Sequence, residues 1–100
     1  MTIPILDNEI KKDPQNALLY NKRATAYMYT GEIAKAVADF DFVLSQASGE
    51  ASAYFYKALC LEKLGNINAA LENYTLAIKY GIPKSQQVDY AEKRIRELQR

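Results

Sequence analysis

An internal repeat restricts the fold of this chain more than any other feature of its sequence. Gly31 and Gly65 define a period of about 34 residues, and the residues around them recur in the same register. The first copy has Ala17, Tyr20, Ala24, Ile33 and Ala36 where the second has Ala51, Tyr54, Ala58, Ile67 and Ala70. A period of roughly 20–50 residues is typical of stacked repeats, in which neighbouring units bury one another's apolar faces. Such stacks expose long surfaces and generally function by binding.

The four glycines predict where helices end. They are Gly31, Gly49, Gly65 and Gly81, and they are almost evenly spaced. Glycine is favoured just past a helix because it accepts a left-handed backbone. This spacing leaves room for helices of about three to four turns. We therefore expect helices over residues 5–12, 16–30, 33–46, 51–64 and 67–80, followed by a last helix that Pro83 and Ser85 open. Asp13 or Asn16 is expected to cap the second helix, and Ser85 the last one.

Small and large side chains alternate along the apolar stripes of these expected helices. The small residues are Ala24, Ala36, Ala58 and Ala70, and the large ones are Tyr20, Tyr27, Phe40, Tyr54 and Tyr74. Such pairing lets neighbouring helices interdigitate without voids. Cys60, the single cysteine, lies in an apolar stretch and is expected to be a small core residue.

The last helix is expected to close the stack. Val88, Ala91, Ile95 and Leu98 form one apolar stripe, and the opposite side is charged. A terminal repeat needs this combination, because one face packs against the array and the other meets water. The basic residues there do not indicate an anion or nucleic-acid site, since Asp89, Glu92 and Glu97 interrupt them.

The repeated residues resemble the tetratricopeptide-repeat family. The first copy of the family pattern is Tyr20, Ala24, Tyr27, Gly31, Ala36 and Phe40, and the second is Tyr54, Ala58, Leu61, Gly65, Ala70 and Tyr74. Leu6 and Pro14 match the second half of an earlier repeat, and Val88 and Ile95 match the first half of a later one. Departures from the pattern are Arg23 and Lys57 in place of leucine, Ser48 in place of proline, and Pro83 one residue late.

The resemblance implies an all-α fold, namely a right-handed stack of antiparallel helix pairs with a C-terminal capping helix. Residues 1–100 would form a single domain. Within it, residues 1–15 would be a partial repeat, 17–50 and 51–84 two full repeats, and 85–100 the capping helix. Roughly three repeats are usually needed for independent stability, and the two half-units bring this chain close to that number.

Composition and missing residue types exclude several classes of function. The net charge is +1 and no apolar run approaches the roughly 20 residues of a membrane span, so neither nucleic acid nor membrane is an expected partner. Histidine is absent, there is one cysteine, and the glycines are isolated, so we expect no enzyme, metal or cofactor. Asp39 and Asp41 are expected to be solvated charges rather than a catalytic pair. Without a signal sequence or disulfide, the cytoplasm is the default location.

The resemblance also implies a binding groove, because in this family the first helix of each pair lines a concave surface that receives a peptide. The expected groove residues are Leu18, Asn21, Thr25, Met28, Tyr29, Ser52, Phe55, Leu59, Glu62, Gln86 and Lys93. Phe55 and Tyr29 would anchor an apolar segment, and Asn21 would fix its orientation. The function expected is therefore that of an adaptor or scaffold for a protein or peptide.

Three other readings of this surface stay open at the level of sequence. A chaperone-tail clamp of asparagines and basic residues is not expected, because only Asn21 is suitable and the region of the clamp is occupied by Thr25, Phe55, Tyr56, Gln86 and Tyr90. The apolar positions could instead be covered by the N-terminal segment, by a second copy or by another part of a longer protein, which would make the domain structural or self-associating. An RNA-binding helical repeat is a minor alternative that the short array and low charge do not favour.

Overall fold

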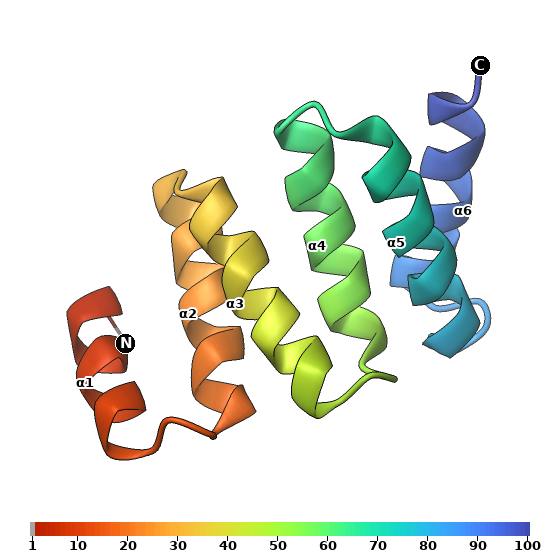
Figure 1. The fold of residues 1–100 in the computed structure, drawn as a ribbon. Helices are drawn as coiled ribbons and strands as arrows, with labels where there is room; N and C mark the ends of the chain where they lie inside the picture. The colour runs from red at the N-terminus through yellow and green to blue at the C-terminus, as the bar shows by residue number, and fades with distance from the viewer. Residues whose placement is uncertain (1) are drawn as a thin grey trace.

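The computed structural model describes residues 2–100 as six helices, with no strand among those residues. They are α1 (Ile3–Lys12), α2 (Ala17–Thr30), α3 (Ile33–Gln46), α4 (Ala51–Lys63), α5 (Ile67–Tyr80) and α6 (Gln86–Leu98). The helices stand side by side in chain order, with α1 at one end of the array and α6 at the other (Figure 1). The array is elongated, measuring 44 × 25 × 20 Å. The expected all-α stack is confirmed.

Capping explains where the helices begin. Asn16, rather than Asp13, caps α2, because its side-chain oxygen accepts the N–H of Leu18 at 3.1 Å. The hydroxyl of Ser85 accepts the N–H of Val88 at 3.3 Å and caps α6, as expected. α1 begins two residues earlier than expected, at Ile3. Its first turn contains Pro4, which has no N–H and is tolerated where the helix has no partner for one.

Gly31 and Gly65 end their helices with the predicted left-handed backbone, Gly81 ends α5 with an extended backbone, and Gly49 lies beyond the end of α3. Gly31 and Gly65 have φ of +84° and +80°, the left-handed region that favours glycine. Gly49 and Gly81 lie outside that region. Gly81 is required for a different reason, because an added Cβ would lie 2.5 Å from the carbonyl oxygen of Ala77. Lys84 takes the left-handed backbone in the α5–α6 connection, with φ of +64°.

The core follows the predicted pairing of small and large side chains. Ala24, Ala36, Ala58 and Ala70 are fully buried, and so are Phe40 and Tyr74. One cluster joins α2, α3 and α4, and a second joins α4, α5 and α6. Val37 and Tyr56 contact both clusters, so the core is continuous from one repeat to the next.

Cys60 lies inside this core, as expected. Its side chain is fully buried. Burial raises the pKa of the thiol, and Lys63 opposes this only in part. A protonated and inaccessible thiol is a packing residue rather than a nucleophile.

Replacing Ala70 with leucine is expected to overpack the contact between α4 and α5. Ala70 is fully buried in a cluster with Ala58 and Tyr74, so three extra carbons have no space to occupy. We expect the free energy of unfolding to fall by about 1–3 kcal/mol, measured by urea denaturation. Ala38→Leu is the control, because Ala38 is exposed on α3. An Ala70→Leu protein as stable as the control would contradict the proposed packing.

Polar contacts between consecutive repeats recur with the repeat period. The Tyr20 hydroxyl donates to the carbonyl of Pro14 at 2.9 Å, and that of Tyr54 donates to the carbonyl of Ser48 at 2.7 Å. The ammonium of Lys57 pairs with Asp41 at 2.6 Å. These contacts tie the first helix of one repeat to the end of the repeat before it.

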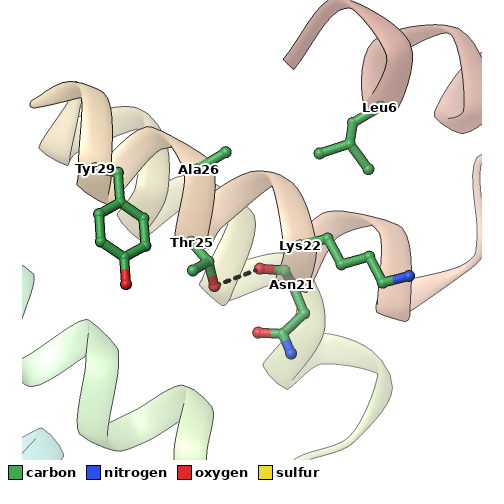
Figure 2. Close-up of a pocket in the computed structure, with 6 residues that line it drawn as sticks. All are labelled: Leu6, Asn21, Lys22, Thr25, Ala26 and Tyr29. Atoms are coloured by element: carbon green, nitrogen blue, oxygen red, sulfur yellow. Dashed lines mark hydrogen bonds between the residues drawn. The ribbon is translucent and has the colours of Figure 1, made fainter. Parts of the chain in front are cut away.

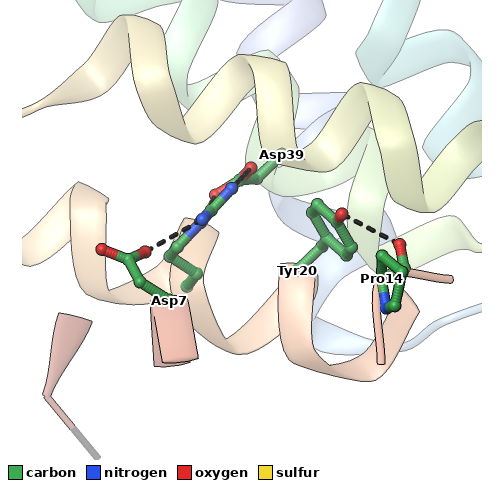
Figure 3. Close-up of polar contacts among 5 residues, drawn as sticks. Asp7, Pro14, Tyr20 and Asp39 are labelled. Atoms are coloured by element: carbon green, nitrogen blue, oxygen red, sulfur yellow. Dashed lines mark hydrogen bonds and ion pairs between the residues drawn. The ribbon is translucent and has the colours of Figure 1, made fainter. Parts of the chain in front are cut away.

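Arg23 makes the corresponding ion pair in the first repeat and adds a second one. It pairs with Asp7 of α1 at 2.9 Å, and Asp7 lies one repeat period before Asp41. Its guanidinium also forms two hydrogen bonds, both of 2.8 Å, with Asp39 of α3. Figure 3 shows Asp7 and Asp39 on either side of this contact, with Tyr20 and Pro14 nearby. Asp39 is buried, so the expectation that it is a solvated charge is wrong.

Candidate peptide-binding groove

A groove lies between α2 and α4, the first helices of the two full repeats. It encloses about 490 Å³. We call it the α2–α4 groove and define it by its lining residues, Asn21, Thr25, Met28, Tyr29, Ser52, Tyr56 and Lys63. α2 and α4 line it with different faces, because only Tyr29 and Lys63 of these residues are repeat equivalents.

Five of the expected site residues line this groove, and two of its residues were not expected. The five are Asn21, Thr25, Met28, Tyr29 and Ser52, and the unexpected two are Tyr56 and Lys63. Lys63 lies one repeat period after Tyr29, so the repeat could have identified it. Tyr56 follows Phe55 directly, and one residue rotates a helical side chain by about 100°. The sequence pattern did not decide which of the two faces the groove.

Several groups in the groove have free hydrogen-bonding capacity. Within residues 2–100, the Asn21 amide and the hydroxyls of Tyr29 and Tyr56 make no hydrogen bond, and Lys63 makes no ion pair. The Thr25 hydroxyl donates to the carbonyl of Asn21 at 3.0 Å and keeps its acceptor capacity. The groove therefore offers an amide, two phenols and a cation beside the apolar Met28.

The remaining expected site residues lie elsewhere. Leu18 is 57% exposed on α2 but outside the groove. Leu59 is half-buried against the α4–α6 core cluster. Gln86 lines a separate cavity of about 450 Å³ at the start of α6. Lys93 is exposed on α6, away from the α2–α4 groove.

Phe55 is a core residue, which contradicts its expected role as an exposed anchor. Only 9% of it is exposed. Its ring meets those of Tyr56, Tyr74 and Tyr90 edge-on, with centroids 5.3, 6.3 and 5.7 Å away. Tyr90 comes from α6, so the last helix covers the position at which the ligand was expected.

Glu62 is also engaged within the domain. Arg94 of α6 donates two hydrogen bonds to its carboxylate, at 2.7 and 3.0 Å, and the Tyr74 hydroxyl donates a third at 2.9 Å. Desolvation disfavours ionisation of this carboxylate, but the bonds from Arg94 and Tyr74 outweigh it and lower the pKa of Glu62. The Glu62 carboxylate therefore joins α4 to α6 through its ion pair with Arg94, and it is not free to bind a ligand.

Acid is expected to weaken the domain partly through Glu62. Since folding lowers the pKa of Glu62, its contribution to stability is fully present above its ordinary pKa of 4.5 and is lost as pH falls through the folded value. We expect the stability difference between the wild type and Glu62→Gln to shrink as pH is lowered from 6 to about 3. Urea denaturation across this range measures it. A difference that does not change with pH would contradict the assignment.

α6 meets α4 with side chains that keep the repeat register. Tyr90 and Arg94 lie one repeat period after Tyr56 and Cys60, the residues of α4 on its α2-facing side. Tyr90 contacts Phe55, and Arg94 pairs with Glu62. These contacts fill the space between α4 and α6, whereas the groove between α2 and α4 is open. Only the small buried residue of α6, Ala91, lies one position before its place in the repeat.

Comparison with known proteins supports this architecture. No family model matches the chain. Its sequence is similar to the tetratricopeptide repeat and J domain-containing co-chaperone DNJ1 of Fusarium oxysporum f. sp. lycopersici, at 41% identity over 81 residues. That match covers 81% of this chain, but the chain spans only 15% of the length of DNJ1.

Three solved structures have the same fold. The first TPR of Spaghetti (RPAP3), bound to the HSP90 peptide SRMEEVD, has a TM-score of 0.85 and 21% identity, covering 97% of this chain and 74% of that one. The TPR domain of Arabidopsis OM64 has a TM-score of 0.85 and 23% identity, covering 95% and 78%. The TPR2B domain of yeast Sti1, in a complex with pHsp70, has a TM-score of 0.84 and 19% identity, covering 97% and 79%.

The described residues contain neither a membrane-spanning helix nor a cluster of metal ligands. No helix within residues 2–100 is long and apolar enough to cross a membrane. The same residues contain no group of three or more cysteine or acidic side chains placed to hold a metal ion. The internal repeat, the paired helices, the likeness to DNJ1 and the three solved structures agree: the chain has the repeat pattern and the fold of a tetratricopeptide-repeat domain.

Proposed function

We propose that this domain is a protein-interaction module that binds an extended segment of a partner in the α2–α4 groove and performs no chemistry of its own. The observation that carries the proposal is the set of uncommitted groups in that groove. The Asn21 amide can bind both the N–H and the C=O of an extended peptide backbone. Met28 and the Tyr29 ring offer apolar contact, and Lys63 offers a charge for an acidic group.

The comparisons favour a role in binding proteins. Two of the similar tetratricopeptide domains hold chaperone peptides, and the similar curated protein is a co-chaperone. At 19–21% identity, the solved structures are similar in fold alone. The ligand of this groove is therefore proposed from its own residues.

A chaperone tail is the second candidate ligand. The likeness to solved domains in complex with an HSP90 peptide and with pHsp70 favours it more than the sequence alone does. The residues still disfavour it. Of the residues in the region of such a clamp, only Asn21 has a suitable side chain, and Thr25, Phe55, Tyr56, Gln86 and Tyr90 are neither asparagine nor basic. Lys63 is the one cation in the groove, so a terminal carboxylate would find one charged partner.

Peptide selection tests the proposal. A library of random twelve-residue peptides is displayed and selected on the chain, and the selected peptides and SRMEEVD are each titrated while amide NMR shifts are followed. We expect selected peptides to shift the resonances of Asn21, Thr25, Tyr56 and Lys63. Lys63→Glu should weaken binding of an acidic peptide at least tenfold. Lys11→Glu is the matched control, since it reverses an exposed lysine on α1 outside the groove.

Each outcome of the titration decides between named alternatives. Peptides that shift only residues outside the groove would contradict the proposed site. Tight binding of SRMEEVD that depends on Asn21 and Lys63 would favour the chaperone tail. A concentration-dependent dimer in sedimentation, with no selected peptide, would favour a self-associating or structural role.

A further inference from the structure

The internal repeat provides a template for surfaces that are covered in one copy and open in the other. α4 turns Ser52, Tyr56 and Lys63 towards α2, and Cys60 of the same side is packed into the core that α2, α3 and α4 share. The residues one repeat period earlier are Leu18, Lys22, Ala26 and Tyr29 on α2. In α4 this side is covered by the preceding first helix, whereas α2 has no such helix beside it (Figure 1).

Residues on this side of α4 are more buried than their repeat equivalents on α2. Cys60 is fully buried, but its counterpart Ala26 is only half-buried. Ser52 is half-buried, whereas its counterpart Leu18 is 57% exposed. Tyr29 is 88% exposed, the highest value among the large hydrophobic residues that are open to solvent. An apolar side of a helix is thus left open at the N-terminal end of the array.

A hollow of about 460 Å³ lies on this open side. It is lined by Leu6 of α1 and by Asn21, Lys22, Thr25, Ala26 and Tyr29 of α2 (Figure 2). A second hollow of about 490 Å³ adjoins it through Ala26 and Tyr29 and reaches Ile3 of α1. Leu6 itself is buried against Ile10 and Leu19, so the open apolar side belongs to α2. We call Leu18, Lys22, Ala26 and Tyr29 the N-terminal surface.

The C-terminal end of the array, formed by α6, exposes polar rather than apolar side chains. The outer side of α6 is exposed and mostly charged or amide-bearing, with Gln86, Asp89, Glu92, Lys93, Arg96 and Glu97. Exposing these polar side chains to water carries no hydrophobic penalty, whereas exposing the apolar N-terminal surface does. The two ends are therefore not complementary, and end-to-end stacking of identical chains is disfavoured.

We propose that the N-terminal surface is the docking site for an amphipathic helix of the same kind as α2 and α4. The bound helix would pack against α1 and lie beside α2. Its position would repeat that of α2, which packs against α3 and lies beside α4. The proposal continues an interface that the chain already contains between its own repeats. The occupant carries a small residue on the side that faces α1, as Ala24 of α2 packs in one cluster with Phe40 of α3. It carries a carboxylate near Lys22, which makes no ion pair within residues 2–100.

A tethered copy of α2 provides the probe for this surface. Residues 17–34 are duplicated directly ahead of Met1 of the full chain, which keeps the repeat period across the junction. We expect the extension to raise Tm by at least about 5 °C, because it buries apolar area that is now exposed. It is also expected to slow amide exchange at the N-terminal end of the array at least tenfold.

Two matched controls separate docking from a general effect of added length. The first carries Ala24→Glu within the duplicated copy only, so the tether is unchanged but the small contact is lost. The second carries Ala26→Glu in the original α2, and the unextended chain with the same change measures its own effect on Tm at this half-buried position. Both are expected to abolish the rise in Tm.

The same set of proteins can overturn the proposal. An extension that leaves Tm and exchange unchanged means that the N-terminal surface does not accept such a helix. A rise in Tm that survives Ala26→Glu means that the helix lies elsewhere. A dimer of the unextended chain in sedimentation that Ala26→Glu dissolves would replace the helix with a second copy as the occupant.

Discussion

Arg23→Leu is expected to destabilise the domain by about 3 kcal/mol, although leucine is the residue that the family pattern favours at this position. The change leaves Asp39 buried without its partner. The Asp39 side chain is 7% exposed, and that of Arg23 is 20% exposed. Removing one member of a buried pair is costly because the remaining charge has neither water nor a counter-ion. Urea denaturation at pH 7 measures the loss.

Lys57→Leu is the matched control for this prediction. Lys57 occupies the same repeat position, but its partner Asp41 is 52% exposed and can be solvated when the lysine is removed. We expect a loss below about 1 kcal/mol. The double variant Arg23→Leu/Asp39→Asn should recover much of the loss, because the equivalent residue of the second repeat is Asn73, which is buried and donates to the carbonyl of Ala69. Equal losses for Arg23→Leu and Lys57→Leu would contradict the account.

Phe55→Ala is expected to lower the free energy of unfolding by about 3–5 kcal/mol. Phe55 contacts three aromatic rings and joins α4 to both α5 and α6, so truncation leaves a cavity at a junction of three helices. Amide exchange should accelerate most in α6, whose contact through Tyr90 is lost. Denaturation together with hydrogen exchange measures both effects.

Asn21→Ala is the control for Phe55→Ala, since Asn21 lies one repeat period earlier at the equivalent position. Its side chain makes no hydrogen bond within residues 2–100 and lines the α2–α4 groove. We expect its removal to change stability by less than about 0.5 kcal/mol. A stable Phe55→Ala protein would restore Phe55 as a candidate ligand contact.

The helices and their core could be predicted because they depend on local chemistry that repeats along the chain. Glycine at positions 31 and 65 ends helices through its backbone freedom, and alanine at positions 24 and 58 allows close helix contact. The groove could be predicted only in part. Asn21, Thr25 and Ser52 follow from the repeat, whereas the choice of Tyr56 over Phe55 depends on the packing of α6.

The sequence by itself determined the period, the number of helices, their ends and the side chains that pair in the core, because each depends on residues close together in the chain or one period apart. The tertiary structure alone decided which surfaces stay open. Tyr90 and Arg94 of α6 contact Phe55 and Glu62 of α4, so the second groove position is filled by the domain itself. Burial of Asp39 likewise depends on how Arg23 reaches across from α2 to α3. Such contacts join side chains whose meeting depends on helix rotation, which a sequence pattern does not specify.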